Sequence, residues 1–245
     1  EDEAAAALSF VPVTLNGGSY AKSRASALLL RRIGGGAVLH GLLNAFYDKM
    51  FQDTHLDQFV RSHDDPHASR LANWIIEKMG GEGDVWTSER VARARCPIAV
   101  HLSGRGEHVV HDRTTAHVAA WFSPKRPRDV LGEHFKLHDA RVWMRLMFWA
   151  CREQGLFEDP VFESWFVRFI AHFVRVYERM APYFARDSAR WSIDPENIKT
   201  YVANGNKMPV QVLGSDGRGV SVREAIKQVP PREINDEVWP YNRID

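Results

Sequence analysis

The stretch Ile33–Met50 reads IGGGAVLHGLLNAFYDKM and predicts an amphipathic helix that begins after a run of three glycines. Apolar side chains recur in it at three- and four-residue steps and so share one face: Leu39, Leu43, Phe46 and Met50. Tyr47 continues the row of Leu43, which directs its hydroxyl inward with the core side chains. A buried hydroxyl needs a hydrogen-bond partner, so Tyr47 is a candidate for a polar role.

Further helices are predicted on both sides of this stretch. Ser23 is placed to cap a short helix that ends at Arg32, and Asp65-Pro66 starts another with a capping carboxylate. Gly155 ends a long helix that begins near His138. Asp159-Pro160 then starts a second long helix, whose apolar face continues to Met180 and indicates burial against several neighbours; it comprises Phe162, Trp165, Phe166, Phe169, Ile170, Phe173, Val176, Tyr177 and Met180.

Four segments in order resemble the truncated-globin family. They are the glycine-led helix with its Phe46-Tyr47 pair, the segment 56–59, the segment 71–81 that ends in Gly-Gly, and the tryptophan-led segment 143–156. The matches span roughly residues 32 to 181. The resemblance implies an all-α fold, a truncated-globin-like helical sandwich with an irregular insertion and an extended C-terminal tail.

The domain boundaries follow from this alignment of motifs. Residues 1–22 form an N-terminal extension, and 23–181 the globin-like domain. Residues 82–112 lack a sustained helical period and are predicted to be an insertion with a short strand at 98–102. Residues 182–245 are polar and rich in glycine and proline, which predicts an extended tail lying on its own domain or on a partner protein.

In truncated globins a proximal histidine binds the iron of haem b, and two residues compete for that role here. His134 matches best by position, His117 lies on a more convincing short helix, and His138 ranks third. These histidines are the candidate metal ligands. Each is alternatively a partly exposed side chain at a helix end.

The remaining cofactor-binding candidates lie on the distal side. Tyr47 corresponds to the tyrosine that contacts the diatomic ligand, and His67 and Trp143 add donors around it. Phe59 would pack on the porphyrin, although Val60 competes for that place. His67 shares one face of its helix with apolar side chains that include a further candidate: Leu71, Trp74 and Ile75.

Composition limits the partners. The formal net charge of +1 and a pI near 8.1, with both signs interspersed, give no argument for nucleic acid. No apolar run is long enough to cross a membrane. Two isolated cysteines, Cys96 and Cys151, favour a reducing compartment, although a disulfide between them stays open. A second histidine group within the insertion could bind zinc, but its spacing matches no standard site: His101, His108, His111 and Asp112.

Two functions follow. The first is a haem protein that binds dioxygen or a related diatomic gas, by reversible binding or by redox turnover; the sequence does not choose between them. The second is a globin-fold subunit without haem that holds protein partners through its insertion and residues 182–245. The start at Glu1 rather than methionine predicts an organellar protein of mitochondrion or plastid, with the cytoplasm as the alternative.

Overall fold

The computed structural model describes residues 2–94 and 113–241, and these residues are mainly helical. A small antiparallel hairpin of β1 (Thr14–Asn16) and β2 (Ser19–Ala21) follows a short first helix, α1 (Asp2–Ala6). Helix α2 (Arg24–Arg32) comes next, with the predicted Ser23 cap: its hydroxyl accepts a hydrogen bond from the Ser26 N–H. Among the described helices, none is both long enough and apolar enough to span a bilayer.

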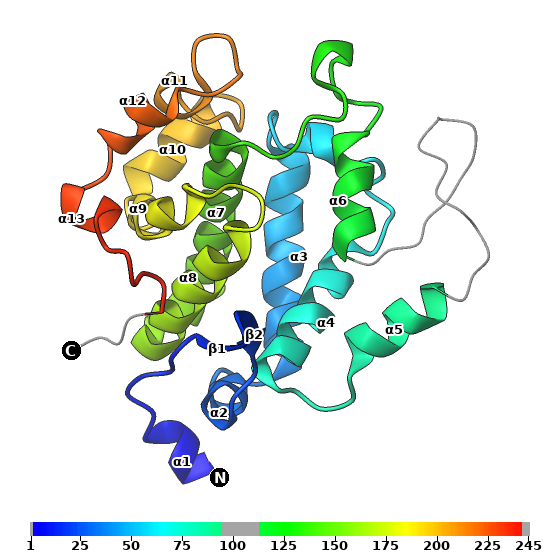
Figure 1. Cartoon of the computed structure of the whole chain (residues 1–245), viewed down its shortest axis with the longest axis vertical. Helices are drawn as coiled ribbons and strands as arrows, with labels where there is room; N and C mark the ends of the chain where they lie inside the picture. Colours follow the sequence, from blue (N-terminus) through cyan, green and yellow to red (C-terminus); the bar gives the residue numbers. More distant parts are fainter. Residues whose placement is uncertain (1, 95–112, 242–245) are drawn as a thin grey trace.

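The predicted glycine-led helix is confirmed as α3 (Gly36–Gln52), which packs against α4 (His67–Met79) and α7 (Leu137–Glu153) at the centre of the molecule (Figure 1). The backbone conformation before α3 explains why glycines occur there. Gly34 and Gly35 have φ angles of 98° and 80°, a region that side chains with a Cβ rarely adopt. The chain therefore turns from α2 into α3 within the three residues 33–35.

The two long C-terminal helices are confirmed, but the second is shorter than predicted. Asp159 caps α8 (Pro160–Val174) by accepting hydrogen bonds from the N–H groups of Val161 and Phe162. The apolar face to Val174 is largely buried. The helix ends there, and Val176 is 66% exposed. The polar run Glu178-Arg179 separates α8 from the next apolar turn, η4 (Ala181–Phe184).

Several short elements cover the ends of this core. Helix α5 (Val85–Ala94) packs against α4, and α6 (Arg113–Trp121) contacts η1 (Asp57–Phe59). Two further single turns are η2 (Arg128–Val130) and η3 (Leu156–Glu158). Helix α5 corrects the prediction that residues 82–112 lack helical structure. The predicted strand at 98–102 and the histidine group of the insertion lie outside the described residues.

The α4 helix also corrects a capping prediction. The first helical residue is His67, its cap position is Pro66, and the Asp65 side chain makes no cap hydrogen bond. Instead the Asp65 carboxylate lies 3.9 Å from His67 Nε2, while its backbone carbonyl accepts a hydrogen bond from the His67 N–H. The carboxylate therefore acts on the side chain of His67 and not on the helix end.

The predicted tail is helical and not extended, and of the two placements left open it lies on its own domain, because residues 185–241 fold back onto the core. They form α9 (Ala185–Trp191), α10 (Pro195–Ala203), α11 (Val210–Leu213), α12 (Val222–Ile226) and α13 (Pro231–Ile234), which lie along one side of α7 and α8 (Figure 1). The buried apolar side chains of this segment are spread along its whole length: Ala185, Ala189, Trp191, Tyr201, Met208, Val212, Leu213, Ala225 and Val229. Ion pairs supplement them, such as Arg190 with the buried carboxylate of Glu233 at 2.5 Å. A segment held in this way has a polar composition although it is packed.

Both ends of the described chain meet on α8. The Tyr20 ring, on the N-terminal hairpin, packs edge-on against Phe169 at 5.3 Å between ring centroids. The Tyr241 hydroxyl lies 2.8 Å from Nδ1 of His172, one turn further along. Nearby, the Trp239 indole N–H donates to the carbonyl of Pro182. The most apolar helix is thus covered by segments from opposite ends of the sequence.

Candidate functional site

The predicted distal residues lie together where α3, α4 and α7 meet. The rings of Tyr47 and His67 stack, with centroids 5.5 Å apart and planes inclined by 22°. Phe46 joins this pair to the third candidate, because its ring lies 5.1 Å from Tyr47 and 5.1 Å from Trp143. Leu71 is half-buried on α4 and packs against the same core. The three predicted polar side chains are therefore linked by successive ring contacts, from His67 through Tyr47 and Phe46 to Trp143.

Burial sets the protonation of this pair. It raises the pKa of the Tyr47 hydroxyl well above its ordinary value, against the opposing effect of the Arg70 charge, so Tyr47 remains a hydrogen-bond donor at neutral pH. Burial also lowers the pKa of His67, outweighing the hydrogen bond to the Ser62 carbonyl and the nearby charge of Asp65. Nε2 of His67 lies 2.9 Å from that carbonyl, so Nε2 carries a proton.

We expect stability to fall as the pH falls through the lowered pKa of His67. Below its ordinary value of 6.5 the unfolded chain binds the proton before the folded chain does, so the stabilisation is present above 6.5 and is lost in acid. The ring C–H resonance of His67 in an NMR titration gives the pKa directly. The His67→Gln variant should lose this part of the pH dependence of unfolding; a pKa at or above 6.5 would contradict the prediction.

The two predicted proximal histidines lie elsewhere. His134 is exposed and stacks on Trp121, with ring centroids 3.9 Å apart. His117 is half-buried, and its Nδ1 lies 2.9 Å from the Tyr177 hydroxyl. Phe59 and Val60, the two competitors for the place on the porphyrin, are both buried. His117, but not the outward-lying His134, is thus placed near Phe59.

Phe135 lies between His117 and Phe59. Its ring centroid is 5.1 Å from that of Phe59 and 5.5 Å from that of His117. The guanidinium of Arg126 covers the Phe59 ring as well, at 4.7 Å. A porphyrin bound by His117 and packed on Phe59 would need the space between these two rings. As the side chains are placed, haem does not fit there unless Phe135 moves.

A third group, which the sequence did not reveal, brings together His55, His138 and Asp139. All three are buried, and one ligand atom from each lies within 4.8 Å of the others. Nε2 of His55 is 2.5 Å and Nε2 of His138 is 3.3 Å from the same carboxylate oxygen, Oδ1 of Asp139. Both imidazoles therefore point at one oxygen atom.

The local fold fixes each member of this group. Asp139 is the third residue of α7, and its other oxygen, Oδ2, accepts a hydrogen bond from the Lys136 N–H at the helix start. Asp53, which is fully buried, holds the turn around His55 by accepting from the N–H groups of His55 and Leu56 and from the Tyr201 hydroxyl. Helix capping thus leaves Oδ1 of Asp139 turned toward the histidines.

The group was missed because its members are distant in the sequence. His55 lies 84 residues before Asp139, in a turn whose polar residues carry no recognisable spacing. His138 was considered only as the third proximal candidate. The sequence offers one signal for this group, the His-Asp dipeptide at the start of a predicted helix, but that dipeptide does not indicate that His55 is its partner.

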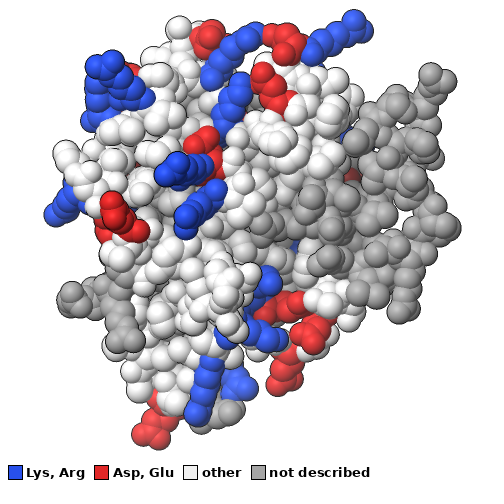
Figure 2. All heavy atoms as spheres, viewed as in Figure 1, with Lys and Arg blue, Asp and Glu red and all other residues white. Residues whose placement is uncertain are grey.

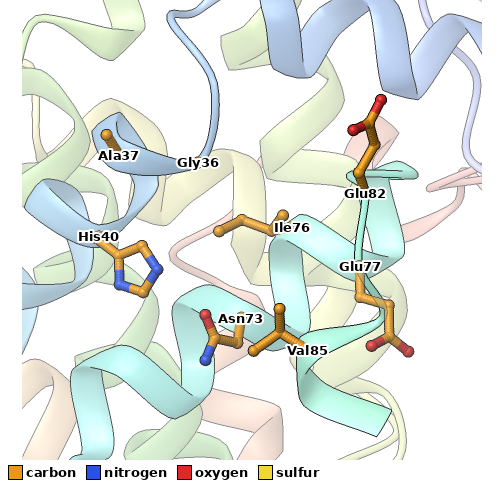
Figure 3. A pocket seen from close by; sticks show the side chains of 8 residues that line it. All are labelled: Gly36, Ala37, His40, Asn73, Ile76, Glu77, Glu82 and Val85. Atoms are coloured by element: carbon orange, nitrogen blue, oxygen red, sulfur yellow. The ribbon is translucent and has the colours of Figure 1, made fainter. Parts of the chain in front are cut away.

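A hollow of about 410 Å³ lies at the other end of the α3–α4 pair, beside α5. Figure 3 shows His40 and Asn73 on one side of it and the carboxylates Glu77 and Glu82 on the other. Glu77 accepts hydrogen bonds from the backbone N–H and the hydroxyl of Thr87. Its carboxylate thereby holds α5 onto α4, which is a structural role.

Comparisons with protein-family models, with curated proteins and with solved structures found no match for this chain.

Proposed function

We propose that this chain is a globin-like helical sandwich that works without haem, as a structural subunit of a protein assembly. The observation that carries the proposal is the position of Phe135, whose ring contacts both His117 and Phe59. On this proposal, the side chain of Phe135 takes the place that a porphyrin bound by His117 would need. A fold can persist after its ligand site is lost, so the family resemblance and the filled site are compatible.

The packing of the helices supports the globin-like part of the proposal. Helices α3 and α4 pack against each other, α7 packs on α3, and α8 follows α7. This is the order that the resemblance to truncated globins implies.

The surface supports the structural role. Half of the ten large apolar side chains that are exposed in the described residues belong to the segment 185–241: Ile193, Val202, Val210, Val222 and Val238. On the face shown in Figure 2, lysine and arginine side chains are interspersed with acidic ones, as in a surface without one dominant charge. We infer that protein partners contact the folded C-terminal segment, in which these exposed apolar side chains are concentrated.

Hemin titration of the purified chain tests the absence of haem. We expect no sharp Soret band at one equivalent of hemin.

The second candidate function, binding of a diatomic ligand at haem iron, is favoured by the stacked pair of Tyr47 and His67. A sharp band in the wild type that His117→Ala or His134→Ala abolishes would establish that function and overturn our proposal.

Phe135→Ala is expected to increase hemin affinity by roughly tenfold or more, because it removes the ring between His117 and Phe59. The gained Soret band should disappear when His117→Ala is added. Phe122→Ala, which shortens an exposed phenylalanine, is the matched control and should not change hemin binding. Equal affinities for Phe135→Ala and the wild type would show that Phe135 does not block the site.

The assembly is tested in the native source by gel filtration and blue-native electrophoresis with an antibody to the chain. We expect the chain to migrate far above its own mass of 28.0 kDa. Val202→Asp with Val210→Asp, on the exposed apolar side chains, should release it, whereas Val85→Asp on α5 should not. Migration of the native protein as a monomer would overturn the proposed role.

A further inference from the structure

We propose that His55, His138 and Asp139 form a binding site for one divalent transition-metal ion, with zinc as the best-matched ion. Two imidazole nitrogens and one carboxylate oxygen are a donor set that zinc takes readily, with a fourth position left to water or another oxygen. This inference is independent of the proposed assembly role and of haem.

The distances agree with small adjustments. Ligand atoms of a tetrahedral zinc ion stand about 3.4 Å apart, given zinc–ligand distances of about 2.0–2.1 Å. Nε2 of His138 is already 3.3 Å from Oδ1 of Asp139. Nε2 of His55 is 2.5 Å from the same oxygen and would have to move away from it by about 0.9 Å to reach the tetrahedral spacing. All three ligand atoms lie within 4.8 Å of one another without the ion.

The charge of the group favours a cation. The group consists of one carboxylate and two imidazoles and contains no cationic side chain. Two cationic side chains in the same region hydrogen-bond to other acceptors: Lys136 to Glu133, and Arg126 to the carbonyls of Trp121 and Glu133.

The C-terminal segment also packs against the group, at His138. Gly219 lies directly over the His138 ring: a Cβ added to it would stand 2.1 Å from Nδ1. The ion would therefore join three parts of the chain, the turn after α3, the start of α7, and, through His138, the loop before α12. Such a link stabilises the folded state, as structural zinc sites do.

The test uses the full chain after treatment with a chelator, titrated with Zn²⁺ in a calorimeter and with Co²⁺ by visible absorption. We expect one ion per chain, an absorption band typical of tetrahedral Co²⁺, and a melting temperature that rises with Zn²⁺. His138→Gln and Asp139→Asn should each weaken binding by about 100-fold or more, since they replace an imidazole nitrogen and a charged carboxylate by neutral amides, which are weak zinc ligands. The matched control is His63→Gln, because His63 is an exposed histidine paired with Asp57 close to the same turn.

A measurement on the wild type keeps the proposal testable if the ligand variants do not fold. Histidine side-chain NMR should show the ring nitrogens of His55 and His138 shifting on addition of one equivalent of Zn²⁺, before those of His63 and His67. The proposal is overturned if Zn²⁺ does not bind stoichiometrically, if it shifts the exposed histidines first, or if folded His138→Gln binds as the wild type does.

Discussion

Replacing Asp187 by alanine is expected to lower the free energy of unfolding by about 4 kcal/mol, because it leaves two buried guanidinium groups without their shared carboxylate. Arg141 is 1% exposed, and its Nη2 lies 3.8 Å from Asp187. Nη2 of Arg145 lies 3.4 Å from the same carboxylate. Burial, and next the charge of Arg145, lower the pKa of Arg141 to about 10, while Asp187 opposes this. The carboxylate therefore offsets a repulsion that the protein core cannot screen.

Chemical denaturation measures the effect, and a double variant identifies its cause. Adding Arg145→Met to Asp187→Ala should recover part of the loss, because one of the two unpaired charges is removed. Glu196→Ala is the control: Glu196 is an exposed partner of Lys199 at 3.5 Å, and its loss should cost well under about 1 kcal/mol. Equal losses for Asp187→Ala and Glu196→Ala would contradict the argument.

Gly219→Ala is expected to cost about 3 kcal/mol, from two sources. The backbone at Gly219 has a φ of 86°, where alanine costs about 1–2 kcal/mol. The new methyl group would also stand 2.1 Å from Nδ1 of His138, so either the loop or α7 must shift, at about 1–3 kcal/mol.

The Gly217→Ala variant distinguishes the cost of the backbone conformation from the cost of the contact with His138. Its φ is 77°, almost the same, and a Cβ added there would meet nothing within 4 Å. Gly217→Ala should therefore show the backbone cost alone, and the difference between the two variants measures the contact with His138. If the two alanines cost the same in urea denaturation, Gly219 does not press on the histidine. Combining Gly219→Ala with His138→Ala should be clearly less than additive.

The elements that could be predicted are those that local signals determine. The Ser23 cap, the Asp159-Pro160 start and the ending of α7 before Gly155 each depend on residues within one turn, and each is confirmed. The Asp65 cap failed because a carboxylate near a helix start has other partners, here His67. Local patterns predict helix positions better than they predict side-chain partners.

The candidate site was harder to predict because its deciding contacts are distant in sequence. The stacking of Tyr47 on His67 joins α3 and α4. Nothing in the sequence around Phe135 distinguishes a ring that fills a pocket from one that borders it. The helical packing of the tail is hard to predict for a related reason. Its burial depends on ion pairs such as Arg190–Glu233, which look like solvated charges in a sequence. Haem binding and the organellar location remain predictions.

The meeting of both chain ends on α8 has a consequence for synthesis on the ribosome. Helix α8 carries the most apolar stretch of the core, yet its cover includes Tyr241 on His172 and the Trp239 ring on Arg168. During translation this helix leaves the ribosome before those residues do, so part of its surface stays exposed until the segment 185–241 has been made. Nascent chains with exposed apolar surface aggregate or recruit chaperones. The helices that follow α8 thus complete the folding of this core as well as its surface.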